Sequence, residues 1–173
     1  MSDERWDLVR PVLTAWKDAR PSVSGHAGRY ELREFVNAIL YQARTGCQWR
    51  YLPKDLPPDG AVYYYFAKWR DDGTAQTIHD LLRWQVREMA GRAEDPTAVV
   101  IDSQSVRASN NVPATTAGLD VGKKTPGRKR GIATDVIGLI IAVVVVAASV
   151  HGNVIADHRV HGLTLALATV LTR

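Results

Sequence analysis

The sequence predicts an α+β protein, with a helical domain in residues 1–92 followed by a β-sheet in residues 97–173. In the first part apolar residues recur at helical spacing, most clearly in residues 30–45. In the second part they come in short β-branched runs, such as residues 143–146, which favour strands over helices. The pattern changes at residues 93–96, which we interpret as a linker.

Composition and charge are those of an ordinary globular protein. Hydrophobic residues make up 46% and charged residues 23% of the 173 residues. The single cysteine, Cys47, excludes an internal disulfide and agrees with a cytoplasmic location. The N-terminus lacks the apolar core of a signal peptide, and the apolar stretch at residues 136–150 is too short to span a bilayer. We therefore expect no membrane partner, while the net charge of +4 suits an acidic one.

Four helices are expected in the N-terminal domain. Ser2 is placed to cap the first, and Pro11 is expected to kink or split it. A loop at residues 18–28 precedes the helix of residues 30–45, and Gly46 is placed to end that helix in the left-handed conformation.

Two further helices are expected at residues 59–72 and 75–90, after a short connector. The apolar positions of the last helix are predicted to face inward, and they are Ile78, Leu81, Leu82, Val86 and Met89. Each of these helices is followed by a glycine, Gly73 or Gly91, which is typical of a helix end.

The helix of residues 59–72 is predicted to have an inward and an outward side. Its spacing directs Val62, Tyr65, Phe66 and Trp69 toward a core and leaves Tyr63, Tyr64, Lys68 and Arg70 outside. Together with the preceding helix, this pattern is similar to a helix-turn-helix unit that binds DNA. A solvated helix face explains the same residues, because exposed Lys and Arg are usual on any helical bundle in water.

A short apolar run at residues 99–101 leads into Asp102 and then into polar residues. This pattern predicts a strand that is buried on both faces and ended by Asp102. A buried carboxylate needs a partner, and Mg²⁺ is one, since it prefers one or two carboxylates together with water and phosphate oxygens. A structural aspartate that caps the next turn is the alternative, and both readings stay open here.

A polar loop is expected at residues 107–127, and it leads into the densest basic cluster of the chain. The cluster consists of Lys123, Lys124, Arg128, Lys129 and Arg130. Contacts to a phosphate backbone and a solvated loop are both compatible with it. Residues 128–134 and 139–149 are predicted to be strands joined by a turn at residues 135–138, which completes a three-stranded antiparallel sheet.

The last part of the chain combines histidines with an apolar segment. His151, His158 and His161 lack the tight ligand pairs of zinc sites, so no zinc is expected. Residues 163–171 are expected to form a helix, and they alone are available to cover the aliphatic strand at residues 143–146. A sheet with an open aliphatic face and an unpaired outer strand predicts self-association.

Five tracts of the sequence occur in the order typical of one protein family. They are FVNAILYQARTGCQWRYLP and VYYYFAKWRDDGT in the N-terminal part, and VVIDSQSVRAS, GLDVGKKTPGRKRGIATDVIGLIIAVVV and AASVH in the C-terminal part. These tracts resemble the DDE-class transposases of bacterial insertion sequences. The resemblance implies a helical domain that binds the terminal inverted repeats of the element in double-stranded DNA, and a location at the bacterial nucleoid.

The resemblance also implies a ribonuclease-H-like catalytic domain in residues 97–173. In it Asp102 matches the first of three carboxylates that hold two Mg²⁺ ions, and the basic cluster lies next to that site. Such a site cuts and joins DNA strands, because two metal ions stabilise the attacking and leaving oxygens at phosphorus.

The second and third carboxylates of the family have no clear match. After Asp102 the acids are Asp120, Asp135 and Asp157, and no glutamate follows Glu94. Asp120 falls in the expected loop, Asp135 in the expected turn, and Asp157 too close to the last strand for the family's spacing. We therefore expect a truncated ribonuclease-H-like sheet and a chain that is catalytically incomplete alone. The alternative is a non-catalytic DNA-binding regulator or inhibitor, or an inert remnant of a decayed element.

Overall fold

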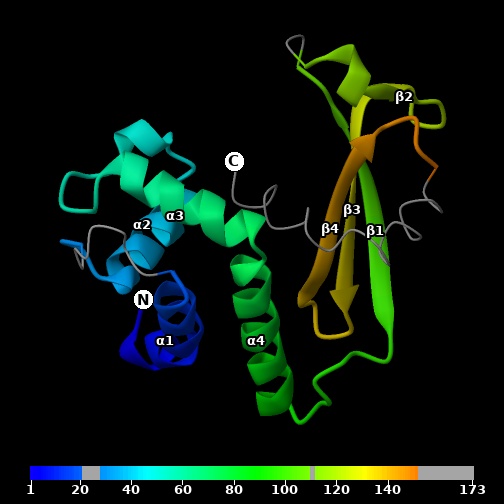
Figure 1. The fold of residues 1–173 in the computed structure, drawn as a ribbon. Helices are drawn as coiled ribbons and strands as arrows, with labels where there is room; N and C mark the ends of the chain where they lie inside the picture. Colours follow the sequence, from blue (N-terminus) through cyan, green and yellow to red (C-terminus); the bar gives the residue numbers. More distant parts are fainter. Residues whose placement is uncertain (21–27, 110–111, 152–173) are drawn as a thin grey trace. The chain divides into compact units, whose positions relative to one another are not determined.

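The computed structural model describes residues 1–20, 28–109 and 112–151 (Figure 1). These residues form four α-helices followed by a four-stranded antiparallel sheet, which confirms the predicted α+β fold. The helices are α1 (Asp3–Asp18), α2 (Leu32–Thr45), α3 (Asp59–Asp71) and α4 (Thr74–Met89), with the 3₁₀ turn η1 (Trp49–Tyr51) between α2 and α3. The strands are β1 (Val99–Arg107), β2 (Gly118–Asp120), β3 (Thr125–Asp135) and β4 (Ile140–Ala147), with the 3₁₀ turn η2 (Ala114–Thr116) before β2.

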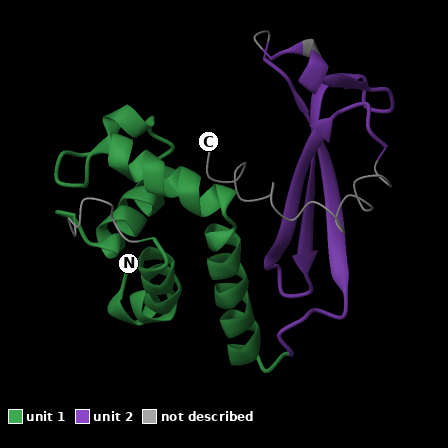
Figure 2. Cartoon of the chain, in the orientation of Figure 1, with its two compact units in different colours: residues 1–92, 171–173 green, residues 93–170 purple. Residues whose placement is uncertain are grey.

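The chain divides into two compact units, and each is described by itself (Figure 2). The helical unit comprises residues 1–92, and the sheet unit begins at Ala93 and is described as far as His151. Within the described ranges, no helix is long and apolar enough to cross a membrane.

Helix α1 begins at its predicted cap. The backbone N–H of Arg5 donates to Oγ of Ser2 over 3.5 Å, which satisfies one of the free donors at the helix start. The helix then runs through Pro11 as one element, so of the predicted kink or split the split does not occur. Proline removes one hydrogen bond of the helix, and burial of Val9 and Leu13 on either side holds the remaining turns together.

Helix α2 confirms the helix expected at residues 30–45, although it starts at Leu32. At its start the N–H of Glu31 donates to Oε2 of Glu34 over 2.7 Å, as in a capping box. At its end Gly46 has a φ of 67°, the left-handed conformation that glycine adopts without steric cost.

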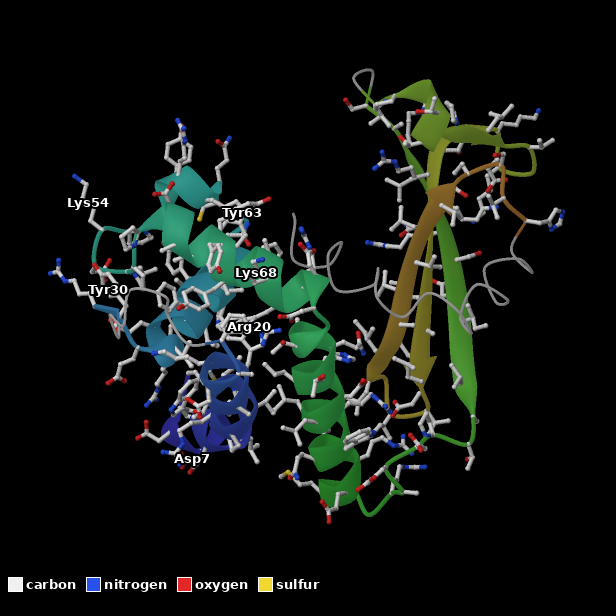
Figure 3. All side chains as sticks on the ribbon, viewed as in Figure 1. Asp7, Arg20, Tyr30, Lys54, Tyr63 and Lys68 are labelled. Atoms are coloured by element: carbon white, nitrogen blue, oxygen red, sulfur yellow. The ribbon has the colours of Figure 1, made fainter. Side chains whose placement is uncertain are left out.

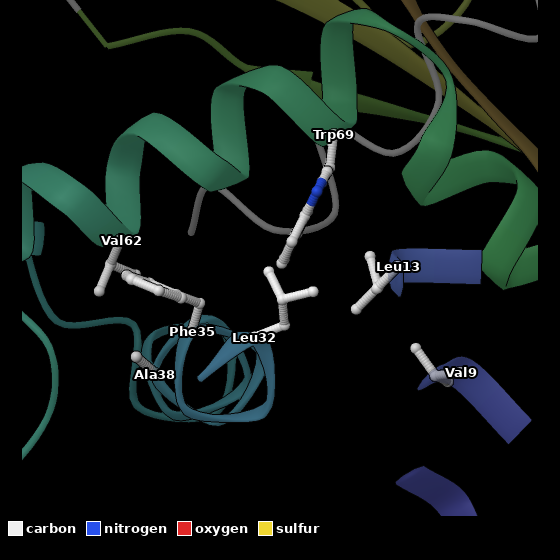
Figure 4. Packing of buried hydrophobic residues seen from close by; sticks show 7 residues of the cluster. All are labelled: Val9, Leu13, Leu32, Phe35, Ala38, Val62 and Trp69. Atoms are coloured by element: carbon white, nitrogen blue, oxygen red, sulfur yellow. The ribbon is translucent and has the colours of Figure 1, made fainter. Parts of the chain in front are cut away.

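The core of the helical unit lies between α1, α2 and α3 (Figure 4). Its buried members are Val9, Leu13, Leu32, Phe35, Ala38, Val62 and Trp69. Aromatic rings extend it, since the ring centroids of Phe35 and Tyr65 lie 4.2 Å apart and those of Trp16 and Trp69 lie 5.9 Å apart. Because burying such large apolar side chains is the main stabilising term in a unit of this size, the inward side of α3 is fixed as predicted.

Helix α4 follows the prediction only in its first half. Ile78 and Leu82 pack against the core, whereas Val86 is exposed and Met89 is 86% exposed. The prediction that Val86 and Met89 face inward is therefore wrong. Periodicity identifies an apolar stripe on a helix, but burial also requires a neighbouring element along the whole length of that stripe.

Asp72 joins α1 to the turn between α3 and α4. Its Oδ2 accepts a hydrogen bond from the indole N–H of Trp16 over 2.5 Å and lies 3.2 Å from Nη2 of Arg20. Its Oδ1 accepts from the backbone N–H and the hydroxyl of Thr74 over 3.1 and 2.6 Å. Partial burial raises the pKa of Asp72, but the hydrogen bonds from Thr74 and Trp16 outweigh it and hold that pKa below its usual value.

β3 is the central strand of the sheet. Its residue Ile132 lies between Asp102 of β1 and Val143 of β4. Its residue Gly127 likewise lies between β1 and Gly118 of β2. β4 and β2 therefore follow one another along the edge of β3 that lies opposite β1.

The hairpin between β3 and β4 confirms the strands expected at residues 128–134 and 139–149. Asp135 closes this hairpin, because its Oδ1 accepts from the N–H groups of Ile137 and Leu139 over 3.0 and 2.9 Å. Its own N–H donates to the carbonyl of Leu139 over 3.0 Å. The predicted turn at residues 135–138 is thus an aspartate-capped loop.

Asp102 lies inside β1 and does not end it, so that prediction is wrong. The ladder continues through the polar residues to Arg107, because β3 offers backbone partners along the whole of β1. Val100 is 58% and Ile101 42% exposed, so the prediction of a strand buried on both faces is also wrong. β-branched residues favour strands whether or not both faces are covered.

Two expectations for the rest of the sheet unit also change. The loop predicted at residues 107–127 contains η2 and β2, and β3 already begins at Thr125. Val143 is buried and its neighbours in β4 are half-buried, so the predicted open aliphatic face at residues 143–146 is not present. The expected helix at residues 163–171 lies outside the described residues, as do His158 and His161.

Replacing Asp72 by alanine should destabilise the helical unit by about 1–3 kcal/mol, because Trp16, Arg20 and Thr74 lose their common acceptor. All five tryptophans of the chain lie in residues 1–92, so tryptophan fluorescence during urea unfolding of the full chain reports on this unit. Asp71→Ala is the matched control, since Asp71 is exposed and pairs with the adjacent Arg70, and it should leave the midpoint nearly unchanged. Equal losses in both variants would contradict a special role for Asp72.

Candidate catalytic strand and nucleic-acid interface

The pairing of β1 with β3 assigns the side chains of these strands to two faces, because opposite residues point the same way and neighbours alternate. The Asp102 face carries Val100, Asp102, Gln104 and Val106 of β1 and Arg128, Arg130, Ile132 and Thr134 of β3. The Ser105 face carries Val99, Ile101, Ser103, Ser105 and Arg107 of β1 and Lys129, Ala133 and Asp135 of β3. The basic cluster predicted from the sequence is thereby divided between the two faces.

Asp102 is exposed near the middle of β1. It lies directly opposite Ile132, so an aliphatic side chain and not another charge faces it across the ladder. In the part of the chain that the structure describes, its carboxylate makes no hydrogen bond and no ion pair. The carboxylate is therefore open to solvent, to a cation or to a polar ligand.

Arg130 is the basic residue of the Asp102 face that is nearest to Asp102 in register. It pairs with Gln104, two residues along β1 from Asp102, and its Nη2 donates to Oε1 of Gln104 over 2.9 Å. Diagonal neighbours on one face of a sheet lie about 7–8 Å apart. Nε of Arg130 is buried and has no hydrogen-bond partner among the described residues. The guanidinium is thus oriented by an uncharged side chain.

Arg128 lies on the same face, one pair further from Asp102. Its Nη2 donates to Oγ1 of Thr116 over 2.8 Å, and its Nε donates to the Thr116 carbonyl over 3.3 Å. Lys123 and Lys124 lie in the turn between β2 and β3 and are exposed. Nζ of Lys123 donates to the Ser103 carbonyl over 3.5 Å. Arg128 and Lys123 thus have uncharged partners, and Lys124 is exposed.

Lys129 lies on the Ser105 face, where Asp120 holds it. Its Nζ lies 3.5 Å from Oδ2 of Asp120 and donates to the carbonyl of Val150 over 2.8 Å. The hydroxyl of Ser105 donates to the same carboxylate, and the N–H of Lys123 donates to its Oδ1 over 3.1 Å. Hydrogen bonds from Ser105 and Lys123, together with the charge of Lys129, lower the pKa of Asp120 to about 2.

The described carboxylates of the sheet unit, as far as His151, do not assemble a metal site. Among the described residues, no group of three His, Cys, Asp or Glu side chains is placed to hold a metal ion. Asp120 and Asp135 belong to the Ser105 face and accept hydrogen bonds from nearby groups, away from Asp102. The described residues therefore do not fit a complete two-metal site, because Asp102 has no second carboxylate beside it among them.

The four residues predicted to contact DNA from α3 are not among its buried residues, and two of them, Tyr63 and Lys68, are labelled in Figure 3. Tyr63 and Tyr64 are exposed, and Nζ of Lys68 lies 5.8 Å from the centroid of the Tyr64 ring, a cation–π distance. Arg70 forms a 2.7 Å ion pair with Asp71, and its hydrogen bond to Asp71 raises the pKa of Arg70. Lys68 and the tyrosines thus present the more available polar groups.

Three residues that shape the site escape sequence reasoning: Gln104, Ser105 and Thr116. A sequence signal exists for the first two. In a strand that continues past Asp102, side-chain alternation places Gln104 on the same face as Asp102 and Ser105 on the opposite face. No local signal connects Thr116 with Arg128, since that contact depends on how η2 folds back beside β3.

Replacing Asp120 by asparagine should destabilise the sheet unit near neutral pH and have little effect at about pH 2. The pKa of this carboxyl is about 2 when folded, below the value near 3.9 expected when unfolded, so its ionised form stabilises the fold. That contribution is present above about pH 4 and is lost as the pH falls toward 2. Thermal unfolding followed by the β-strand band in infrared spectra checks this. A difference in melting temperature that stays constant over this pH range would contradict it.

Comparisons with known proteins identify the family of the chain. Residues 1–79 match the family described as "Putative transposase of IS4/5 family (DUF4096)", and residues 93–172 match the family described as "Transposase DDE domain". The chain is 30% identical over 112 residues to the "Insertion element IS402 uncharacterized 16.2 kDa protein" of Burkholderia cepacia, a match that covers 62% of this chain and 73% of that protein. It is 28% identical over 109 residues to "Uncharacterized protein y4sN" of Sinorhizobium fredii (strain NBRC 101917 / NGR234), covering 62% of this chain and 76% of that protein. No solved structure matches at the same level of significance.

The two family matches follow one another along the chain, one on the helices and one on the sheet. The antiparallel sheet of β1, β3 and β4 is consistent with part of a ribonuclease-H-like domain. These findings confirm the resemblance seen in the sequence. The chain belongs to the IS4/5 family of DDE transposases and carries the N-terminal domain of that family followed by part of a DDE domain.

Proposed function

We propose that the helical unit, residues 1–92, binds double-stranded DNA at the terminal inverted repeats of an insertion element. The observation that carries this proposal is the two-sided character of α3. Its inner side is buried in the core, whereas Tyr63, Tyr64 and Lys68 are exposed on the other side. Family membership supports the proposal, because a transposase must hold the DNA that it moves.

Tyr64 and Lys68 form the centre of this surface. They lie one helical turn apart, and the ammonium group sits near the ring face. A phenol hydroxyl and an ammonium group both donate hydrogen bonds to phosphate oxygens, and such contacts set the position of a protein on the duplex. In this proposal α3 acts as the recognition helix and α2 supports it, in a helix-turn-helix-like arrangement whose connection is residues 46–58.

The proposed role of the sheet unit is narrower. We propose that Asp102 supplies one carboxylate to a Mg²⁺ site of the kind on which the family's strand cutting and joining depends. Among the described residues no other carboxylate lies beside Asp102, so the proposal concerns Mg²⁺ binding at the exposed carboxylate of Asp102 in β1. A protein that binds duplex DNA in this way acts at the nucleoid, in the bacterial cytoplasm.

A DNA-binding regulator or inhibitor is the second candidate function. It is favoured by the position of Asp102, which has no second carboxylate beside it among the described residues. A nicking assay with Mg²⁺ on DNA from the element's end separates the two candidates. Nicking that Asp102→Asn abolishes identifies the transposase, and DNA binding without nicking identifies the regulator.

We also propose that the chain self-associates through the outer edge of β1. In the described part of the sheet no strand pairs with this edge, and Val100 and Ile101 expose apolar surface beside it. The free N–H and C=O groups of an edge strand form a template for a strand of another chain.

Replacing Lys68 and Arg70 together by glutamine should weaken binding of the full chain to duplex DNA from the element's end. Each phosphate contact that is lost lowers the slope of log affinity against log salt by about 0.9, and we expect a fall of about one to two because Asp71 already shares Arg70. Fluorescence anisotropy at several salt concentrations measures this slope. Arg10→Gln is the matched control, since it removes an exposed charge of α1 that pairs with Asp7. An unchanged slope in the double variant would assign this side of α3 to solvent.

Replacing Ile101 by lysine should reduce self-association of the full chain, because a charge on an edge strand opposes pairing with another strand. Sedimentation velocity over a range of protein concentrations measures this. Val121→Lys is the control, since it adds the same charge at an exposed position in the turn between β2 and β3. A monomeric wild-type chain, or equal sedimentation of the wild type and Ile101→Lys, would contradict the proposal.

A further inference from the structure

We infer that Arg130 and Arg128, but not Lys129, bind a DNA phosphate beside Asp102, and that Gln104 orients Arg130 for this contact. The inference rests on the proposed function, since it takes duplex DNA as the ligand. It goes further by dividing basic residues that are adjacent in the sequence according to the face on which β3 places them.

Side chains alternate between the two faces of the sheet along β3. Arg128 and Arg130 share the Asp102 face, whereas Lys129 between them belongs to the Ser105 face. Hydrogen bonds on both faces confirm this assignment, because Arg130 reaches Gln104 and Lys129 reaches Asp120. A phosphate that approaches the Asp102 face therefore meets two guanidinium groups and not the ammonium group of Lys129.

The basic side chains on the two faces differ in how available they are to a phosphate. The side chains of Lys129 and Asp120 are only 12% and 11% exposed, so their ion pair is largely screened from water. Removing Lys129 from this pair would leave a nearly buried carboxylate without its cation, which is costly. Arg130 and Arg128 have the uncharged partners Gln104 and Thr116. A guanidinium group has five N–H donors, so each arginine keeps donors for a phosphate.

Gln104 fixes how the Arg130 side chain lies beside Asp102. Gln104 accepts from Nη2 of Arg130 and so limits the orientations of the guanidinium group, which lowers the entropy lost when a phosphate binds. Arg130 lies on the diagonal from Asp102, at about 7–8 Å. Since residues at this spacing along the sheet lie within the Debye length of about 10 Å at 0.1 M salt, the charge of Arg130 reduces the repulsion between the Asp102 carboxylate and a phosphate. Gln104 is thus a positioning residue and Arg130 a phosphate-binding residue.

The test measures the salt dependence of DNA binding and the melting temperature of the full chain and its variants. Arg130→Gln and Arg128→Gln should each lower the salt slope by about 0.9. Arg107→Gln is the matched control, because it removes an exposed arginine from the Ser105 face of the same strand pair, and the slope should not change. Lys129→Gln should lower the melting temperature and leave the slope unchanged. Equal loss of slope in Arg107→Gln or Lys129→Gln would overturn the inference.

A Gln104→Glu variant separates phosphate binding from a purely structural role of Arg130. The new carboxylate pairs with Arg130 and so should lower the salt slope as Arg130→Gln does, without lowering the melting temperature. A slope that is unchanged in both Gln104→Glu and Arg130→Gln overturns the inference, whatever happens to stability. If that result accompanies a reduced slope in the Lys68 and Arg70 double variant, the proposed function stands and only this inference fails. If the wild-type chain binds no DNA, both fail together.

Discussion

The unbroken ladder between β1 and β3 is the constraint on which the sheet unit depends. Nine residue pairs run from Val99 to Arg107 without a bulge, so a slip of one position would exchange the two faces along the whole ladder. Polar contacts hold this register on both faces: Arg130 of β3 donates to Gln104 of β1 on one face, and on the other face Ser105 of β1 and Lys129 of β3 share Asp120 of β2. The same contacts that fix the fold therefore decide which charges stand beside Asp102.

Close approach at the end of this ladder adds a second constraint. A Cβ atom on Gly127 would lie 2.0 Å from the carbonyl oxygen of Val106, which no real side chain tolerates. Gly127 also pairs with Gly118 of β2, so the strand meets neighbours on both edges at this point. β2 in turn carries Asp120, whose bonds to Ser105 and Lys129 hold the start of β3 against β1. Gly127 thus allows β1 to lie close to the start of β3, where the basic tract enters the strand.

The elements of the fold follow from the sequence more closely than the site does. Helix α2, with its apolar stripe and Gly46, and the hairpin around Asp135 are predictable because local patterning and turn chemistry agree there. The position of Asp102 within its strand is not predictable in this way. A run of three apolar residues indicates where a strand begins, whereas the end of β1 depends on the length of β3 beside it. Met89 shows the same limit in the helical unit, because its exposure depends on tertiary neighbours and not on periodicity.

The site adds a further level, at which residues adjacent in sequence acquire different chemistry. The basic residues between Lys123 and Arg130 form one cluster in the sequence. In the sheet, strand alternation gives Lys129 a carboxylate partner and Arg130 an amide partner. Alternation also removes the other described acids of the strands from consideration, since Asp120 and Asp135 lie on the Ser105 face. Any further carboxylate ligand for a metal ion at Asp102 must therefore reach the Asp102 face from an element beyond the described strands or from another molecule. The polar groups that β1 and β3 themselves supply there are one carboxylate, one amide, one hydroxyl and two guanidinium groups, a set suited to holding a phosphate next to a cation.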